Sequence, residues 1–392
     1  MRALILSAHT GGGHDAAAYA LRDALTQQGV ESRVEDCLAF GGQQLSRLVC
    51  GTYVNMVRYV PQLFGKVYKI GKKLSSTRYK SPIYYVNASY AFRMEQLLAE
   101  YQPDIILCTH LFGGQSVTRL RHKGLYRGVL GMVMTDYTLH PFSEDVEEDA
   151  LFIGHEAMRQ ECLDRGIPEG KIHATGIPVN PACTPCLDKR EAKRALGLDE
   201  NGREVLLVGG SMGAGHLPRA IGMLLPSLRE GDHLTVVCGS NARAKAEAEA
   251  EWAGDSRVSV QGKVSPLYPL MAAADVLVTK SGGLTTSEAM TIGTPMIIIN
   301  PIEGCETANA SFFERCGLAS YCHKPEELPQ RLDALLHSDE DRAAMIAAQR
   351  KEINPNAAAD IAWTMIQLAQ EKEKKQAGPP SKGSRQRKRV KG

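Results

Sequence analysis

The sequence lacks any apolar run approaching the roughly 20 residues that a helix needs to cross a bilayer. Hydrophobic residues make up 43% and charged residues 23% of the 392 residues, an ordinary balance for a globular protein. The start, MRALILSAHTGGGH, also lacks the long apolar core and small-residue cleavage site of an export signal. These absences argue against a membrane-spanning protein and predict a chain that stays in the cytoplasm.

Cysteine pairs with metal-ligand spacing are missing as well. The ten cysteines are scattered, and the one C-x-x-C motif, Cys183 with Cys186, has no second pair of ligands near it. The motif lies in a proline-rich connector rather than between a strand and a helix. We therefore expect reduced thiols, with neither a zinc site nor a redox site.

Acidic residues are absent between Asp36 and Glu95, where nine lysines and arginines alternate with aromatic residues. Aromatic rings settle at the headgroup level of a membrane, and each nearby cation contributes about 1 kcal/mol on an anionic leaflet. We interpret this stretch as a surface for an anionic membrane and a lipid acceptor. A helical hairpin packed over the N-terminal half and a nucleic-acid surface are the alternatives, and nucleic acid is not expected. The residues assigned to this surface are Tyr53, Arg58, Tyr59, Phe64, Lys66, Tyr68, Lys72 and Lys73.

Short apolar runs alternate with helical stretches along the chain. In the first half they are RALILSA, PDIILCTH, GVLGMVMTD and DALFIGH, and later they are EVLLVGG, HLTVVCG, RVSVQG, DVLVTKSGG and PMIIINP. Such runs are typical of buried parallel strands joined by crossover helices. The pattern predicts an α/β fold of two Rossmann-like, doubly wound domains whose strand ends face a central cleft.

The domain limits follow from the connector IPVNPACTPCLD. We place an N-terminal domain for the acceptor and the membrane at residues 1–184, a C-terminal domain for the donor at 185–360, and a helix at 361–375. Residues 371–392 hold nine basic and two acidic side chains, a net charge of +7, with few apolar residues. We expect a disordered basic tail over 376–392, either simply solvated or a membrane tether.

Two glycine-rich turns directly follow predicted strands. In the first, Gly12 and Gly13 precede His14 at the start of a helix, where glycines admit a ligand and free N–H groups attract negative charge. An imidazole there can accept the proton of a hydroxyl at neutral pH, or it simply caps the turn. The second turn, with Gly210, Ser211 and Gly213, suits a diphosphate.

The second turn is followed by no G-K-[ST], and its spacing is not G-x-G-x-x-G. ATP hydrolysis and a dinucleotide site are therefore not indicated. A third turn precedes Glu288, whose carboxylate can accept both hydroxyls of a ribose, or is simply an acid favoured in the first turn of a helix. On the next helix Glu306 and Asn309 share a face that suits sugar hydroxyls. The donor residues assigned from this region are Ser281, Gly282, Gly283, Thr285, Glu288, Glu306 and Asn309.

Four segments in this order resemble the monogalactosyldiacylglycerol synthase and processive diacylglycerol glucosyltransferase family, in glycosyltransferase family 28. They are SAHTGGGH, MTDYTLHPF, TKSGGLTTSEAM and NPIEGCETANASFFERCG. The chain is similar, more distantly, to the transferase that adds N-acetylglucosamine to the peptidoglycan lipid precursor. The resemblance covers nearly the whole chain except the tail.

The resemblance implies an inverting GT-B glycosyltransferase that needs neither metal nor cofactor. It assigns His14 as the base, Asp136 as its acidic partner and His140 to the acceptor side. Ser211 and Gly213 would hold the diphosphate, Val264 the uracil through its backbone, Glu288 the ribose, and Glu306 with Asn309 the sugar. The chain departs from the family where Cys305 replaces a glutamine and Ser143 a tryptophan.

The expected reaction moves glucose or galactose from a UDP-sugar to diacylglycerol at the cytoplasmic face of the membrane, for glycolipid synthesis. Two enzyme alternatives stay open: a UDP-N-acetylglucosamine 2-epimerase, and a transferase to another lipid such as a polyprenyl-linked precursor. A non-catalytic nucleotide-sugar or nucleic-acid binder is the third class. The acid-free stretch favours a lipid acceptor over a soluble one.

Overall fold

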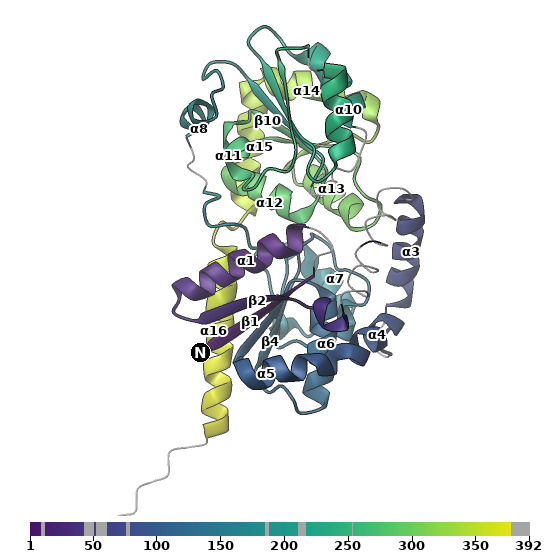
Figure 1. Cartoon of the computed structure of the whole chain (residues 1–392), viewed down its shortest axis with the longest axis vertical. Helices are drawn as coiled ribbons and strands as arrows, with labels where there is room; N and C mark the ends of the chain where they lie inside the picture. The colour runs from purple at the N-terminus through teal and green to yellow at the C-terminus, as the bar shows by residue number, and fades with distance from the viewer. Residues whose placement is uncertain are drawn as a thin grey trace, which may run out of the picture.

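The computed structural model describes residues 1–8, 12–42, 51, 61–75, 79–184, 188–210, 217–252 and 254–377. It contains two six-stranded sheets, one above the other in Figure 1, each flanked by helices. All strand pairs within the sheets are parallel. The predicted two-domain α/β architecture is therefore confirmed.

The first sheet has the order β2-β1-β3-β4-β5-β6. Its strands are β1 (Arg2–Ser7), β2 (Glu31–Asp36), β3 (Ile105–Cys108), β4 (Val129–Val133), β5 (Ala150–Phe152) and β6 (Ile172–His173). The inner strands β3, β4 and β5 are buried along their whole length, as expected for apolar runs covered on both faces. The helices of this part are α1 (Gly12–Gln27), η1 (Ala39–Gly41), α3 (Pro61–Leu74), α4 (Pro82–Tyr90), η2 (Ala91–Met94), α5 (Glu95–Tyr101), α6 (Leu111–His122), η3 (Ser143–Asp145), η4 (Glu156–Met158), α7 (Arg159–Asp164) and η5 (Glu169–Lys171).

The second sheet has the order β12-β11-β10-β7-β8-β9. Its strands are β7 (Glu204–Val208), β8 (His233–Val237), β9 (Val258–Gln261), β10 (Val276–Thr279), β11 (Met296–Ile298) and β12 (Ser320–Tyr321). The surrounding helices are α8 (Lys189–Ala195), α9 (Leu217–Leu224), η6 (Leu225–Ser227), α10 (Ala242–Trp252), α11 (Tyr268–Ala273), α12 (Gly283–Ile292), α13 (Cys305–Arg315), η7 (Pro325–Glu327), α14 (Leu328–His337) and α15 (Asp339–Glu352). Among the described helices, none is long and apolar enough to cross a membrane.

The last helix, α16 (Ala357–Ala377), returns to the first sheet, beside which it runs in Figure 1. It packs against α1, β3 and β4, and Ile361 and Met365 are fully buried in the core there. The helix expected at 361–375 is therefore present, is longer at both ends, and belongs to the core of the N-terminal half. Residues 378–392, which hold most of the predicted tail, lie outside the described residues.

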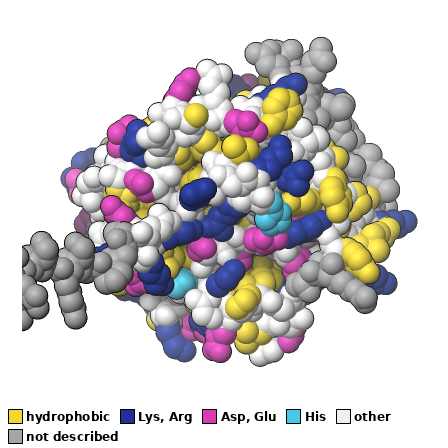
Figure 2. Space-filling model, turned by 90° about the horizontal axis from the view of Figure 1, so that it is seen from below, with side chains coloured by type: hydrophobic (Ala, Val, Ile, Leu, Met, Phe, Trp, Pro, Cys, Tyr) yellow, Lys and Arg dark blue, Asp and Glu magenta, His cyan; other side chains and the backbone are white. Residues whose placement is uncertain are grey.

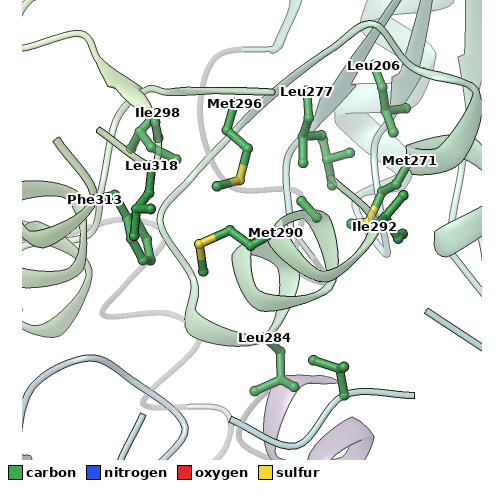
Figure 3. Close-up of a cluster of buried hydrophobic side chains, with 14 of the residues drawn as sticks. Leu206, Met271, Leu277, Leu284, Met290, Ile292, Met296, Ile298, Phe313 and Leu318 are labelled. Atoms are coloured by element: carbon green, nitrogen blue, oxygen red, sulfur yellow. The ribbon is translucent and has the colours of Figure 1, made fainter. Parts of the chain in front are cut away.

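The core of the second half lies between its sheet and α12 and α13 (Figure 3). Leu206, Leu277, Met296 and Ile298 point from the strands toward Met290, and Leu284 lies at the edge of this cluster nearest α1. α1 and α12 pack directly against each other. The same core receives Tyr137 from the loop after β4, so side chains of both halves contribute to it.

Tyr137 contacts the second half through both its ring and its hydroxyl. Its ring stacks on Phe312 with the centroids 5.1 Å apart, and its hydroxyl lies 2.8 Å from the Ser287 hydroxyl. Next to it, a β-carbon at Gly283 would overlap the carbonyl oxygen of Thr135. Glycine at the start of α12 thus allows the backbone of the β4 loop to approach closely.

Candidate active site

A cavity of about 480 Å³ lies between the two halves of the molecule. One wall is the start of α1, and the other is formed by the ends of β7 and β8, the loop before α11 and the first turns of α12. The carboxyl ends of parallel strands are where α/β proteins bind ligands. The cavity has the size and position expected of a nucleotide site.

Six of the predicted donor-binding residues line this cavity: Gly12, Gly13, Gly210, Val264, Thr285 and Glu288. Ser211 and Gly213 lie outside the described residues. Ser281, Gly282, Gly283, Glu306 and Asn309 lie beside the cavity rather than on its wall. Lys263, Tyr268 and Asn180 line it and were not predicted; their loops carry no glycine-rich motif that would have singled them out.

Glu288 places a carboxyl group on the cavity wall. Burial raises the pKa of Glu288 to about 7. Within the part of the chain that the structure describes, no side chain forms a hydrogen bond or ion pair with this carboxyl group. It is therefore available to a hydroxyl-rich ligand, and it accepts two hydrogen bonds best when deprotonated.

Lys280 is a cation near the second glycine-rich turn that the sequence analysis missed. It follows β10 directly, and its side chain passes so close to Gly210 that a β-carbon there would lie 3.1 Å from Lys280 Cε. Its Nζ donates to Glu306 Oε1 at 3.0 Å. Gly210 itself has a positive φ of 75°. The position of Lys280 directly after a buried parallel strand, where such folds bind ligands, is the signal that could have identified it.

Glu306 and Asn309 make their hydrogen bonds inside the protein. Glu306 Oε2 accepts from the Ile302 N–H at 2.8 Å, while Oε1 pairs with Lys280. The Asn309 amide is fully buried; its oxygen accepts from the Tyr137 N–H, and its nitrogen donates to Asp136 Oδ1 at 2.7 Å. In this arrangement Asn309 orients Asp136. Glu306 and Asn309 could bind a sugar only by exchanging these internal hydrogen bonds for bonds to the sugar.

The glycine-rich third turn also has a structural role in this arrangement. The Ser281 hydroxyl donates to the Glu306 carbonyl oxygen at 2.6 Å and fixes the start of α13. Gly282 is the N-cap of α12, and Gly283 contacts the β4 loop rather than the cavity. Of these three residues, Gly283 contacts the other half, whereas Ser281 and Gly282 contact α13 of their own half; their assignment to the donor stays a prediction.

His14 lies in the first turn of α1, half-buried. Its Nδ1 lies 2.8 Å from the carbonyl oxygen of Thr109. A carbonyl oxygen has no hydrogen to donate, so Nδ1 carries the proton and Nε2 keeps its lone pair. Burial, followed by the charge of His140, lowers the pKa of His14 below its ordinary value despite the opposing effect of Thr109. A neutral imidazole with a free Nε2 is the form that a general base requires.

Three histidines surround a small cavity of about 30 Å³ at the base of the cleft. The ring of His110 contacts that of His14 edge-on, with the centroids 4.7 Å apart, and His140 lines the same space. Burial and the neighbouring histidines hold the pKa of His110 well below its ordinary value. His140, assigned to the acceptor side, thus lies directly beside the candidate base.

Asp136 is buried next to these rings. Its Oδ2 lies 3.0 Å from His140 Nε2, an ion-pair distance whose angle is poor for a hydrogen bond. Burial acts to raise the pKa of Asp136, but His140 and the Asn309 amide outweigh it and keep the pKa below its ordinary value. The hydrogen bond that orients the His14 ring is to the Thr109 carbonyl oxygen, not to Asp136. Asp136 acts on His14 through its charge, which works to raise the pKa of His14.

Asp136, His140 and Cys305 are the one set among the described residues whose spacing could hold a metal ion, with donor atoms within 4.8 Å of one another. Burial, together with the charges of Asp136 and Glu306, raises the pKa of the Cys305 thiol well above its ordinary value. Because the thiolate is the metal ligand, this environment disfavours binding. The expectation that no metal is needed stays a prediction.

The acceptor surface assigned from the sequence is described only in part. Tyr53, Arg58 and Tyr59 lie outside the described residues, as does the side chain of Phe64. The ring of Tyr68 packs under Gly304 of the other half, where a β-carbon would come within 2.9 Å of it. Lys72 forms an ion pair of 2.8 Å with Glu161, while Lys66 and Lys73 are exposed. The inner face of α3 thus covers the cleft, and its outer face meets solvent.

Exposed large hydrophobic side chains concentrate on this side of the molecule. Of the thirteen among the described residues, eight lie between residues 67 and 92: Val67, Ile70, Leu74, Tyr79, Ile83, Tyr85, Val86 and Phe92. From below, hydrophobic and basic side chains lie together on the right, the side on which Figure 1 shows α3 and α4 (Figure 2). A mixed apolar and cationic face of this kind is typical of proteins that bind membranes.

Two Rossmann-like halves enclose one cavity, lined by Glu288 from the second half and, from the first, by Gly12 and Gly13 directly before His14; this arrangement is that of a GT-B glycosyltransferase. Residues 14–179 match the monogalactosyldiacylglycerol (MGDG) synthase family, and residues 204–362 match the C-terminal domain of glycosyltransferase family 28. The chain belongs to this family of hexosyltransferases.

Individual proteins agree with that assignment. The chain is 28% identical over 379 residues to the processive diacylglycerol beta-glucosyltransferase of Bacillus cytotoxicus, with 93% of each chain covered. Its fold matches that of MurG from Acinetobacter baumannii, with a TM-score of 0.61, 17% identity and 93% and 99% of the two chains covered. It also matches a putative UDP-N-acetylglucosamine 2-epimerase from Listeria monocytogenes, with a TM-score of 0.62, 14% identity and 93% and 94% covered. These last two matches establish the fold alone.

Proposed function

We propose that the protein transfers glucose or galactose from a UDP-sugar to the free hydroxyl of diacylglycerol, with inversion at the anomeric carbon. The observation that carries the proposal is the state of His14: its Nδ1 is bonded to Thr109, and its Nε2 is left as the proton acceptor. His14 follows directly after Gly12 and Gly13, which line the cavity of about 480 Å³, and lies in the same half as the exposed apolar side chains of α3 and α4. The names of the relatives support the same acceptor.

In the proposed reaction His14 Nε2 takes the proton of the acceptor hydroxyl. The oxygen attacks the anomeric carbon of the sugar, and the bond from that carbon to the β-phosphate oxygen breaks. UDP leaves with the electron pair of that bond, and the positive charge of Lys280 stabilises the leaving diphosphate. Glu288 holds the ribose in the cavity. We expect no metal ion to take part.

The outer face of α3 and the exposed side chains of α4 would rest on the cytoplasmic face of the membrane. Val67, Ile70 and Leu74 are spaced i, i+3 and i+7, so they form one apolar ridge along α3. Lysines lie beside the ridge, and each would contribute about 1 kcal/mol on an anionic surface. The acceptor then reaches the cleft without leaving the bilayer.

The test incubates purified protein with diacylglycerol in anionic vesicles and, separately, with UDP-glucose, UDP-galactose and UDP-N-acetylglucosamine. Released UDP and new glycolipid are both measured, with a His14→Ala variant as the control. We expect glycolipid from one donor and none from the variant. If the sugar nucleotides bind and no glycolipid forms, the acceptor assignment is wrong, and conversion of UDP-N-acetylglucosamine to its 2-epimer becomes the next assay.

A further inference from the structure

A second cavity, of about 260 Å³, opens on the N-terminal half away from the nucleotide cavity. Its lining residues are Leu38, Pro82, Ile83, Val86, Asn87, Tyr90 and Phe112. The polar atoms of this wall are already engaged: Asn87 Nδ2 donates to Gln115 at 2.5 Å, and the Tyr90 hydroxyl donates to Asn87 Oδ1. A ligand that fits this wall is apolar, because a polar one would lose its hydrogen bonds to water.

The mouth of this apolar cavity lies on the surface with the exposed hydrophobic side chains. Ile83 and Val86 on its rim are 38% and 54% exposed, and Tyr79, Tyr85 and Phe92 are exposed nearby. The whole stretch from residue 37 to 94 contains no acidic side chain. A cavity that opens through such a surface is accessible to lipid in an anionic membrane.

The inner end of the apolar cavity is separated from the candidate base by the first turn of α6. The ring of Phe112 lies 4.3 Å from that of His110, which lies 4.7 Å from that of His14. His110 and Leu111 line the small histidine cavity on one side of this turn, and Phe112 lines the apolar cavity on the other. A diacylglycerol whose free hydroxyl lay at His14 would have its ester-linked acyl chains beside this turn.

We infer that the apolar cavity binds the segment of one acyl chain closest to the glycerol of the diacylglycerol acceptor. The inference rests on the proposed function and adds to it a binding site for the lipid chain. The cavity is smaller than the 300 Å³ or more of sites that enclose a whole drug-sized ligand, so the rest of the chain stays in the bilayer. Each buried methylene should improve binding roughly fourfold until the cavity is full.

The first test measures kcat/KM for diacylglycerols of increasing chain length in uncharged detergent micelles, which removes the electrostatic attraction to the membrane. Wild type is compared with Val86→Trp, which fills the cavity mouth, and with Leu196→Trp, which adds the same ring at an exposed leucine after α8 in the other half. Wild type and Leu196→Trp should show a steep rise with chain length followed by a plateau. Val86→Trp should match them for dibutanoylglycerol and fall at least tenfold below them for long chains.

A second test does not depend on turnover. A diacylglycerol with a photoreactive diazirine near the ester of one acyl chain is irradiated with the protein in micelles, and the labelled peptides are identified by mass spectrometry. We expect label on α4 and around Phe112 in wild type and Leu196→Trp, and its loss in Val86→Trp, with thermal melting confirming that all three fold.

The two assays separate this inference from the proposed function. Glycolipid formation with the same chain-length profile in all three proteins, or label confined to other segments, overturns the acyl-chain site and leaves the transferase intact. Label in the cavity with no glycolipid from any donor supports the acyl-chain site and overturns the transferase.

Discussion

Replacing Glu288 with glutamine should abolish a pH dependence of donor binding that the wild-type protein shows. The carboxyl group titrates near pH 7 because it is buried in the nucleotide cavity. If only the carboxylate accepts both ribose hydroxyls, the apparent Kd equals the intrinsic Kd divided by the deprotonated fraction. That fraction is about 0.09 at pH 6 and about 0.91 at pH 8, so the affinity should rise roughly tenfold between them.

The measurement is calorimetric titration with UDP-glucose, because its diphosphate has no terminal phosphate that titrates in this range, whereas free UDP does. Glu288→Gln should bind more weakly than wild type at pH 8 and with nearly constant affinity from pH 6 to 8. A His14→Ala control should keep the wild-type profile. A flat wild-type profile, or the same slope in Glu288→Gln, would refute the ribose assignment.

The same group affects the stability of the ligand-free protein. The pKa of Glu288 rises from 4.5 to about 7 on folding, so the folded state retains a proton that the unfolded state has lost. The free energy of unfolding should therefore fall as the pH rises from about 4.5 through 7, by on the order of 3 kcal/mol from this group. Glu288→Gln should lack this pH-dependent part of the free energy of unfolding. Urea unfolding at pH 5 and pH 8 would then show a smaller fall in the free energy of unfolding for the variant than for wild type.

Three further predictions concern the chemistry. His14→Ala should lower kcat by roughly 100-fold or more and leave the Kd for UDP-glucose nearly unchanged, as removal of a base should; an equal loss of binding would contradict that role. Lys280→Met should lower kcat by about 10-fold or more, compared with Lys324→Met at an exposed lysine after β12, and equal rates in the two variants would exclude Lys280 from the reaction. Dialysis against EDTA should leave the rate within about twofold of the untreated enzyme; a loss restored by zinc or magnesium would show that a metal takes part.

The regular part of the fold was predictable because buried parallel strands are continuous apolar runs. β3, β4, β7 and β10 all fall in segments identified from the sequence. β2 was missed since its sequence, ESRVED, is polar; it lies at the edge of its sheet and is only partly buried. The packing of α16 was also missed, because an apolar stripe on a helix predicts burial without indicating which sheet buries it.

The residues of the candidate site were predictable where a single local motif contains them. His14 lies in the first turn of α1 and Glu288 further along α12, each on a helix that follows a buried strand, so local pattern places both near the strand ends. The bond from Asn309 to Asp136 joins residues 173 positions apart, and no local pattern encodes it. The same is true of Thr109, whose carbonyl oxygen fixes the tautomer of His14.

The loop after β4 connects these separate contacts. The Thr135 hydroxyl lies 3.2 Å from His14 Nδ1, its backbone carbonyl packs on Gly283, and Tyr137 is inserted into the core of the other half. The residues around the candidate base are therefore positioned by contacts with the half that carries the nucleotide cavity. A movement of that half against the first would shift Thr135 and Asp136 together, because both lie on one short loop fixed at Tyr137. The surroundings of His14 in the first half and the cavity wall in the second are thus connected through this loop as well as through the packing of α1 on α12.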